Sequence, residues 1–150
     1  MQKNVYEKAV ATGHISLRLV GPDGSLKESR DIKNVVVTVG KSFLAEWLTT
    51  AQLTGFMQYI GLGTGTNAAS ASDTALQTEL STRVAGMLTF SANVWQNQAT
   101  FGPGVDTGAI TEAGLFSASS GGTLFARQVF PVVNKAAGDS LQLTWQVTFS

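Results

Sequence analysis

The sequence predicts a mainly β fold: an antiparallel two-sheet β-sandwich, jelly-roll-like, with one short amphipathic helix. Three observations lead to this prediction. The last ten residues alternate between apolar and polar side chains without a fault, the second half of the chain is a series of strand-like segments separated by turn residues, and one stretch alone has a clear helical period.

The C-terminal segment is the clearest strand. Its two faces differ completely, because a β-strand points successive side chains to opposite sides. A slip of one residue would expose the whole apolar row, so the register of this strand is well specified. Trp145 belongs to that row and is therefore expected in the core. The row consists of Leu141, Leu143, Trp145, Val147 and Phe149, and the polar row of Gln142, Thr144, Gln146, Thr148 and Ser150.

Seven further segments have the composition of strands and end at Gly, Pro, Asn or Asp residues. Together with the last strand they give about eight strands at short intervals, which is typical of an antiparallel sandwich. No internal repeat or linker interrupts the pattern. The predicted segments are 14–20, 26–39, 57–62, 84–90, 94–101, 110–118 and 123–130.

One amphipathic helix is predicted at about residues 41–51, directly after Gly40 breaks a β-branched run. The apolar stripe has the i, i+4 spacing that places side chains on one helix face. It includes Trp47, which we therefore also expect in the core. A shorter helical turn is predicted up to Leu80, with Asp73 or Thr74 as its N-cap. The stripe consists of Phe43, Leu44, Trp47, Leu48 and Ala51.

The chain divides into an N-terminal arm, residues 1–11, and a single β-sandwich domain, residues 12–150. The arm has no apolar period of its own, so we expect it to be ordered only by contact with a neighbouring subunit. Val5 and Tyr6 in the arm are candidate interface residues. The N-terminal residues also lack the apolar run of a signal peptide.

Composition argues against several classes of function. Charged residues make up 13% of the 150 residues, against a usual share of about 25%. Ten acidic and ten basic residues cancel, and the basic ones form no cluster, so nucleic acid is not an expected partner. The chain has no cysteine and no apolar segment long enough to cross a membrane. A surface rich in uncharged polar groups is typical of a protein packed among others, because such groups are cheaper to desolvate than charges.

Three features resemble catalytic or binding motifs, and each has a simpler structural explanation. Residues 61–65, Gly-Leu-Gly-Thr-Gly, lack the Lys-Ser/Thr ending of a phosphate loop and are read as a turn with positive φ. His14 is the only histidine, and no Gly-x-Ser-x-Gly motif supplies a nucleophile for it, so a position at a strand edge is favoured. Glu112 is expected either to face solvent or to pair with Arg127.

These features predict a protein that is not an enzyme, with no catalytic residue, no metal and no cofactor. Trp95 is the remaining candidate binding residue, because its neighbours Asn93, Gln96, Asn97 and Gln98 are polar. It is interpreted either as a carbohydrate-stacking or interface aromatic, or as a core residue, with core packing favoured.

Several blocks of the sequence resemble structural proteins of tailed bacteriophages. They cover roughly residues 34–150, and the spacing between them makes the resemblance to virion proteins specific. The blocks are residues 59–66 with 72–80, residues 108–116, residues 124–127, and residues 138–141 with the terminal strand.

The resemblance implies a capsid cement or decoration protein, a small β-sandwich on the outer surface of the virion. Such a protein binds the outer shell and clamps neighbouring major capsid subunits, after synthesis in the host cytoplasm. The expected partners are the major capsid protein and further copies of the chain, as a dimer or trimer. The alternative is a tail, neck or fibre component that contacts other virion proteins or host glycans. The resemblance assigns no catalytic residue.

Overall fold

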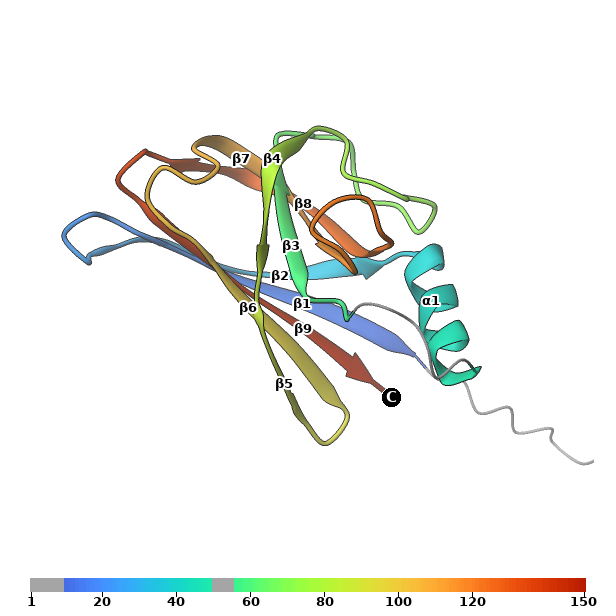
Figure 1. Cartoon of the computed structure of the whole chain (residues 1–150). Coiled ribbons are helices and arrows are strands. Elements are labelled where there is room, and N and C mark those ends of the chain that lie inside the picture. The colour runs from blue at the N-terminus through green and yellow to red at the C-terminus, as the bar shows by residue number, and fades with distance from the viewer. Residues whose placement is uncertain (1–9, 50–55) are drawn as a thin grey trace, which may run out of the picture.

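The computed structural model describes residues 10–49 and 56–150 of the chain (Figure 1). The predicted mainly β, antiparallel architecture with one helix is confirmed for these residues. The elements in chain order are β1 (Ala11–Val20), β2 (Leu26–Val36), α1 (Thr38–Thr49), β3 (Tyr59–Gly63), β4 (Glu79–Ala85), β5 (Met87–Ser91), β6 (Val94–Phe101), β7 (Gly108–Phe116), β8 (Leu124–Lys135) and β9 (Ser140–Phe149).

All nine strands belong to one sheet that is nearly closed into a barrel, in the order β4-β3-β7-β8-β2-β1-β9-β6-β5. The predicted division into two packed sheets with jelly-roll connections is not confirmed. The narrowest junction in the sheet lies between β2 and β8, which share two residue pairs, Val35↔Arg127 and Val36↔Ala126. Arg30 spans the same junction, because its guanidinium donates to the carbonyl oxygens of Pro131 and Val132.

The barrel is brought close to closure by one continuous run of chain, residues 79–91. β4 and β5 are the two ends of the strand order, yet only Gly86 separates them in the sequence. β4 pairs with β3 and β5 pairs with β6, so the run passes from one edge of the sheet to the other. A Cβ atom at Gly86 would lie 1.7 Å from Oδ1 of the buried Asn97 and 2.8 Å from the carbonyl oxygen of Gln98, so this crossing point favours glycine. The single strand predicted at 84–90 is therefore two strands.

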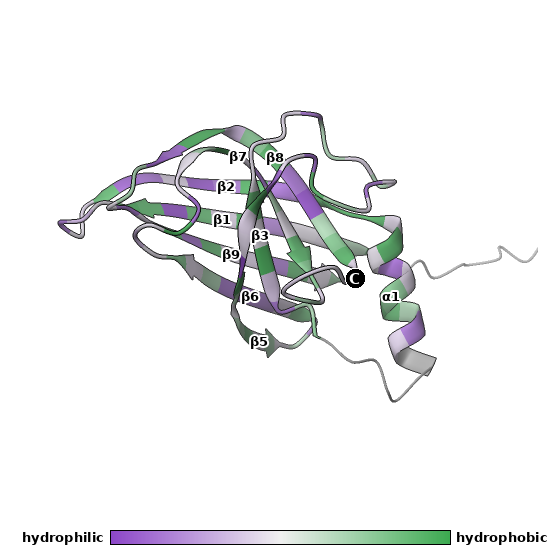
Figure 2. Ribbon diagram, turned by 45° about the horizontal axis from the view of Figure 1, so that its top comes forward, coloured by the Kyte–Doolittle hydropathy of each residue, from purple (hydrophilic) through white to green (hydrophobic). Residues whose placement is uncertain are grey.

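The predicted faces of β9 are confirmed. Leu141, Leu143, Trp145 and Val147 have no exposed surface, while Phe149 at the end of the strand is 39% exposed. The apolar row of β9 packs beside that of β1, with Ile15 paired to Trp145. Figure 2 shows the resulting alternation of hydrophobic and hydrophilic bands along β1, β9 and β6. The core of the barrel therefore follows directly from the two-residue period of the sequence.

Helix α1 begins at Thr38, three residues earlier than predicted. Gly40 does not precede the helix but lies inside its first turn. The residue is glycine because a Cβ there would be 2.4 Å from the carbonyl oxygen of Phe125 in β8. Phe43 and Leu44 pack against the core as predicted, whereas the prediction for Trp47 is wrong, since Trp47 is 50% exposed. The side chains of Leu48 and Ala51 lie outside the described residues.

The helical turn predicted up to Leu80 is wrong. Residues 64–78 form a loop without helix, and β4 begins at Glu79. Asp73 is not a helix cap either, because its Oδ2 accepts a hydrogen bond of 2.9 Å from the backbone N–H of Ser70, three residues before it and not after it. In a helix the backbone N–H groups of Gln77 and Thr78 would donate to carbonyl oxygens of the preceding turn, but here they donate to the carboxylate of Glu112.

The end of the predicted arm is part of the sheet. Val10 and Ser150 exchange two backbone hydrogen bonds of 2.6 and 2.9 Å, and Ala11, the first residue of β1, pairs with Phe149 in β9. Residues 1–9, and with them Val5 and Tyr6, lie outside the described part of the chain. Within residues 10–49 and 56–150, no helix is long and apolar enough to cross a membrane.

Candidate functional site

The most highly connected polar group in the described structure is the carboxylate of Glu112. Glu112 lies on β7 and has no exposed surface. Its Oε1 accepts hydrogen bonds from the backbone N–H groups of Gly65, at 3.0 Å, and Thr78, at 2.8 Å. Its Oε2 accepts from the backbone N–H of Gln77, at 3.1 Å. One side chain therefore holds both ends of the loop 64–78 against the barrel.

Arg127 on β8 completes this arrangement, which we call the Glu112–Arg127–Asp73 network. Its Nε donates to Oε2 of Glu112 over 2.9 Å, and another guanidinium nitrogen donates to Oδ2 of Asp73 over 2.8 Å. The third nitrogen donates to the backbone carbonyl of Asn67 in the same loop. The pairing of Glu112 with Arg127 was one of the two alternatives that the sequence left open, and the structure confirms it.

The glycines of residues 61–65 are needed for close approach to this network. A Cβ on Gly63 would lie 2.5 Å from Oε1 of Glu112 and 2.6 Å from the carbonyl oxygen of Thr78. A Cβ on Gly65 would also lie 2.5 Å from Oε1 of Glu112. Neither glycine has a positive φ, so the conformational reason predicted from the sequence is wrong. The backbone N–H of Gly65 does bind an anion, but that anion is the carboxylate of Glu112.

The electrostatics of the network favour carboxylates that are ionised at neutral pH. Burial acts to raise the pKa of Glu112, but hydrogen bonds from Thr78, Gln77, Arg127 and Gly65 outweigh it and hold the pKa below its ordinary value. Burial also acts to raise the pKa of Asp73, and the bonds from Ser70 and Arg127 likewise leave it lowered. Carboxylates held in this state accept hydrogen bonds and do not exchange protons near neutral pH, which suits a structural role.

No hydrogen bond joins His14 to a hydroxyl group among the described residues. It lies on β1, between β2 and β9 and so not at an edge of the sheet, and its Nε2 is 4.0 Å from Oδ1 of Asp31. Ser16 donates its hydroxyl proton to the same carboxylate and not to the imidazole. The three side chains therefore lack the Ser–His hydrogen bond of a catalytic triad.

Trp95 lies on β6 with its ring directed to the core side of the sheet. It is partly buried and contacts Phe125 at a centroid distance of 6.5 Å, with the two rings tilted by 58°. Its register partner in β5 is Phe90, which is 83% exposed. Trp95 thus packs on the core, and the exposed aromatic of this hairpin is Phe90, which the sequence analysis did not single out.

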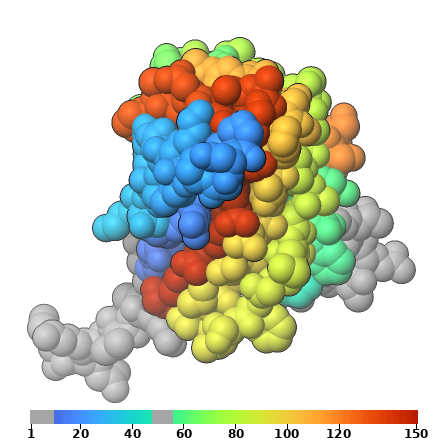
Figure 3. Space-filling model, turned by 90° about the vertical axis from the view of Figure 1, so that its left-hand side faces the viewer, coloured from blue at the N-terminus to red at the C-terminus, as the bar shows by residue number. Residues whose placement is uncertain are grey.

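Apart from Val94, the outward side of β6 and β9 carries hydroxyl and amide side chains, and it carries no charge. Gln146 donates to Gln96 over 2.9 Å, and Gln98 donates to Thr144 over 3.1 Å, so neighbouring strands hold these groups in place. Figure 3 shows this side, with β9 in red between β1 in blue and β6 in yellow. We call it the Gln/Thr face, and it consists of Thr89, Gln96, Gln98, Thr100, Gln142, Thr144, Gln146 and Thr148.

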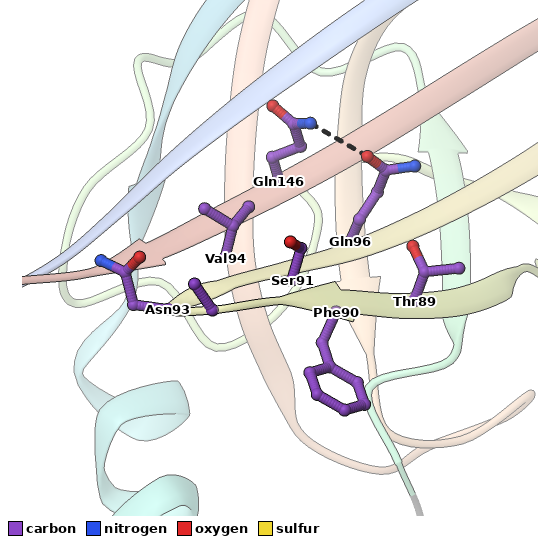
Figure 4. Close-up of a pocket in the computed structure, with 8 residues that line it drawn as sticks. Thr89, Phe90, Ser91, Asn93, Val94, Gln96 and Gln146 are labelled. Carbon is purple, nitrogen blue, oxygen red and sulfur yellow. Dashed lines mark hydrogen bonds between the residues drawn. The ribbon is translucent and has the colours of Figure 1, made fainter.

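A shallow hollow lies at the hairpin end of the Gln/Thr face (Figure 4). The side chains of Thr89, Gln96 and Gln146 lie on one side of the β5–β6 hairpin and of β9, whereas the ring of Phe90 points to the opposite side. Phe90, Val94 and Ala92 also line the hollow, but the ring of Phe90 points away from the hydrogen-bonding groups and does not lie beside them as a platform for a sugar ring. The polar row of β9, visible in the sequence, was the signal for this face.

Within the described residues, no group of three or more His, Asp or Glu side chains is arranged to hold a metal ion. Comparisons with protein-family models, with curated proteins and with solved structures gave no match.

Proposed function

We propose that this chain is a structural component of a tailed-bacteriophage particle, a capsid cement or decoration protein without enzymatic activity. In this role it lies on the outer surface of the virion, binds the assembled shell and clamps neighbouring major capsid subunits. The proposal needs no cofactor and no nucleic acid. It starts from the sequence resemblance and gains support from two features of the structure.

The first supporting feature is that blocks of the resemblance meet at one point. Gly65 and Asp73 come from the first block, Glu112 from the second and Arg127 from the third, and all four belong to the Glu112–Arg127–Asp73 network. Their shared task is to hold a surface loop on a barrel. The residues that carry the resemblance therefore have a structural role in this network, as expected for a structural protein and not for an enzyme.

The second feature, which carries the proposal, is the Gln/Thr face. Its side chains come from β5, β6 and β9, and none of them is charged. Uncharged polar groups lose less free energy on desolvation than ions, so a face of this kind can be covered by a neighbouring subunit at small cost. Contacts made by such groups are also weakly screened by salt. Both properties suit a clamp on a protein shell.

A cement protein stabilises a shell by mass action, because it binds the assembled lattice and not the free subunits. Its contacts must therefore span at least two capsid subunits. We assign the Gln/Thr face to one of these contacts and residues 1–9 to another. Val5 and Tyr6 remain the candidate contact residues of that segment.

Shell binding by charge-insertion variants tests this assignment. Thr100→Lys places a charge on the Gln/Thr face at an exposed position, and Ser120→Lys places the same charge on an exposed loop elsewhere. With shells assembled without the protein, Thr100→Lys should bind at least about tenfold more weakly than wild type, and Ser120→Lys should bind like wild type. Wild-type binding should change little with salt.

Two outcomes would contradict the assignment. Equal binding by both variants would show that the shell contacts another surface. Binding of the wild-type protein to isolated tails, with none to shells, would favour the tail or fibre alternative over the cement role.

A further inference from the structure

Strand β5 presents an unprotected edge. One edge of β5 pairs with β6, and among residues 10–49 and 56–150 no strand pairs with the other edge. Natural sheets usually protect such an edge with Lys, Pro or a bulge. Here residues 84–105 contain no charged residue, and β5 carries Met87 at 66% and Phe90 at 83% exposure. The strand therefore has the properties of one that associates with another strand.

The hairpin register shows which backbone groups of β5 face outward. Ala92 and Asn93 form a two-residue turn closed by the pair Ser91↔Val94, with a φ of 51° at Ala92. The closing pair of such a turn is hydrogen-bonded, and bonded pairs then alternate with non-bonded ones along the hairpin. Thr89 thus bonds to β6, whereas the N–H and C=O groups of Leu88 and Phe90 point away from it.

We propose that two copies of the chain associate through their β5 edges, antiparallel and related by a twofold axis at Thr89. Leu88 of each copy then lies opposite Phe90 of the other, and the outward N–H and C=O groups of these residues bond to each other. Directly opposite side chains lie on the same face of a sheet. Leu88 therefore covers the exposed ring of Phe90, and the two Thr89 hydroxyls meet on the other face.

A second copy is the partner that this edge fits, for two reasons. The pairing is self-complementary, as a twofold interface must be. It also brings no like charges together, because the whole hairpin is uncharged and the chain has no net charge. The pairing joins the Gln/Thr faces of the two copies into one surface. The association follows from the edge strand alone and does not depend on the proposed role in a particle.

The test is the mass of the purified full-length chain, measured by sedimentation over a range of concentrations. The measured mass of the wild-type protein should approach twice the mass of one chain as the concentration rises. Phe90→Lys places a charge on the edge at a position that is already exposed, and it should weaken association by at least about tenfold. Leu26→Lys, at a residue that is 52% exposed in β2, is the matched control and should associate like wild type.

Hydrogen exchange provides a second measurement that needs no variant. The amide protons of Leu88 and Phe90 should become more protected as the protein concentration rises, while the amide of Thr89, already bonded to β6, should change less. The proposal is overturned by a wild-type mass that stays at one chain, by a mass that grows beyond two chains, by equal association of Phe90→Lys and wild type, or by exchange at Leu88 and Phe90 that is independent of concentration. None of these results depends on shell binding.

Discussion

At the scale of single residues, the fold depends on the charge of Glu112. The carboxylate is fully buried and receives bonds from three backbone N–H groups and from Arg127. Its partner guanidinium is also nearly inaccessible, with 3% of the side chain exposed. A buried charge is tolerated only while it is paired. Removing the charge of Glu112 therefore leaves the buried guanidinium of Arg127 with Asp73 as its remaining charged partner.

The first prediction concerns this pair. Glu112→Gln keeps the shape of the side chain but removes its charge, and it should lower the free energy of unfolding by about 3–5 kcal/mol. Glu28→Gln is the control, because Glu28 forms a partly exposed pair with Arg30. Its effect should stay below about 1 kcal/mol. Urea unfolding of both variants measures the difference, and equal effects would show that the network contributes little.

The same carboxylate should make stability depend on pH. The pKa of Glu112 is lower in the folded chain than its ordinary value of 4.5, so the unfolded chain binds a proton at higher pH than the folded chain does. The stabilisation is then fully present above the unfolded pKa and is lost as the pH falls through the folded pKa. Asp73 acts in the same direction.

Comparison of wild type with Glu112→Gln isolates this effect. The difference between their free energies of unfolding should be constant near neutral pH and should shrink as the pH falls from about 5 to about 3, because acid neutralises Glu112 in the wild type only. A difference that stays constant over this range would mean that the pKa of Glu112 is the same in the folded and unfolded chain.

At the scale of elements, the loop 64–78 depends on glycines that let the backbone approach Glu112. Gly63→Ala should destabilise the protein by about 1–3 kcal/mol, because the added Cβ would overlap Oε1 of Glu112 and the carbonyl oxygen of Thr78. Gly102→Ala is the matched control, since nothing lies within 4 Å of a Cβ there and its φ is not positive. Thermal unfolding should separate the two variants, and equal melting temperatures would exclude the close approach.

Strand β9 provides a second prediction at this scale. Trp145→Ala should cost about 3–5 kcal/mol, because it removes a fully buried aromatic from the core. Phe149→Ala changes the same face of the same strand but at a residue that is 39% exposed, so its effect should be clearly smaller. Melting temperatures in the reverse order would show that the buried face of β9 is assigned wrongly.

Elements that depend on local sequence were predictable, and those that depend on distant contacts were not. The alternation in β9 predicted its two faces, and the predicted strand 94–101 matches β6 residue for residue. The start of α1 was missed because Gly40 is required by contact with Phe125, which its neighbours in sequence do not reveal. The absent helical turn before Leu80 has the same cause, since its N–H groups bind Glu112, 34 and 35 residues away.

At the scale of the whole molecule, the run 79–91 nearly closes the barrel, a feature that no local pattern predicts. The sequence of a strand indicates which of its faces is buried but not which strands it pairs with, so a chain that forms one sheet and a chain that forms two can have similar sequences. The Glu112–Arg127 pair was foreseen as one alternative because both residues lie on strands expected to form a hairpin. The bonds from the loop to the same carboxylate were not, because residues 64–78 have no periodicity.

The N-terminal segment offers a further prediction. Val10 and Ala11 pair with the last two residues of the chain, so a deletion that leaves the sheet intact must end at residue 9. Removal of residues 2–9 should preserve the melting temperature of the domain but weaken its binding to shells that lack the protein. Wild-type affinity of the shortened chain would show that the barrel surface alone makes the contact.

The proposed role as a clamp is tested most directly by imaging shells with and without the protein. Reconstructions of the shell alone and of the shell with purified chain added should differ by density on the outer surface, and each copy should touch at least two neighbouring major capsid subunits. Difference density confined to the tail or neck, or identical reconstructions at saturating protein, would contradict the proposal.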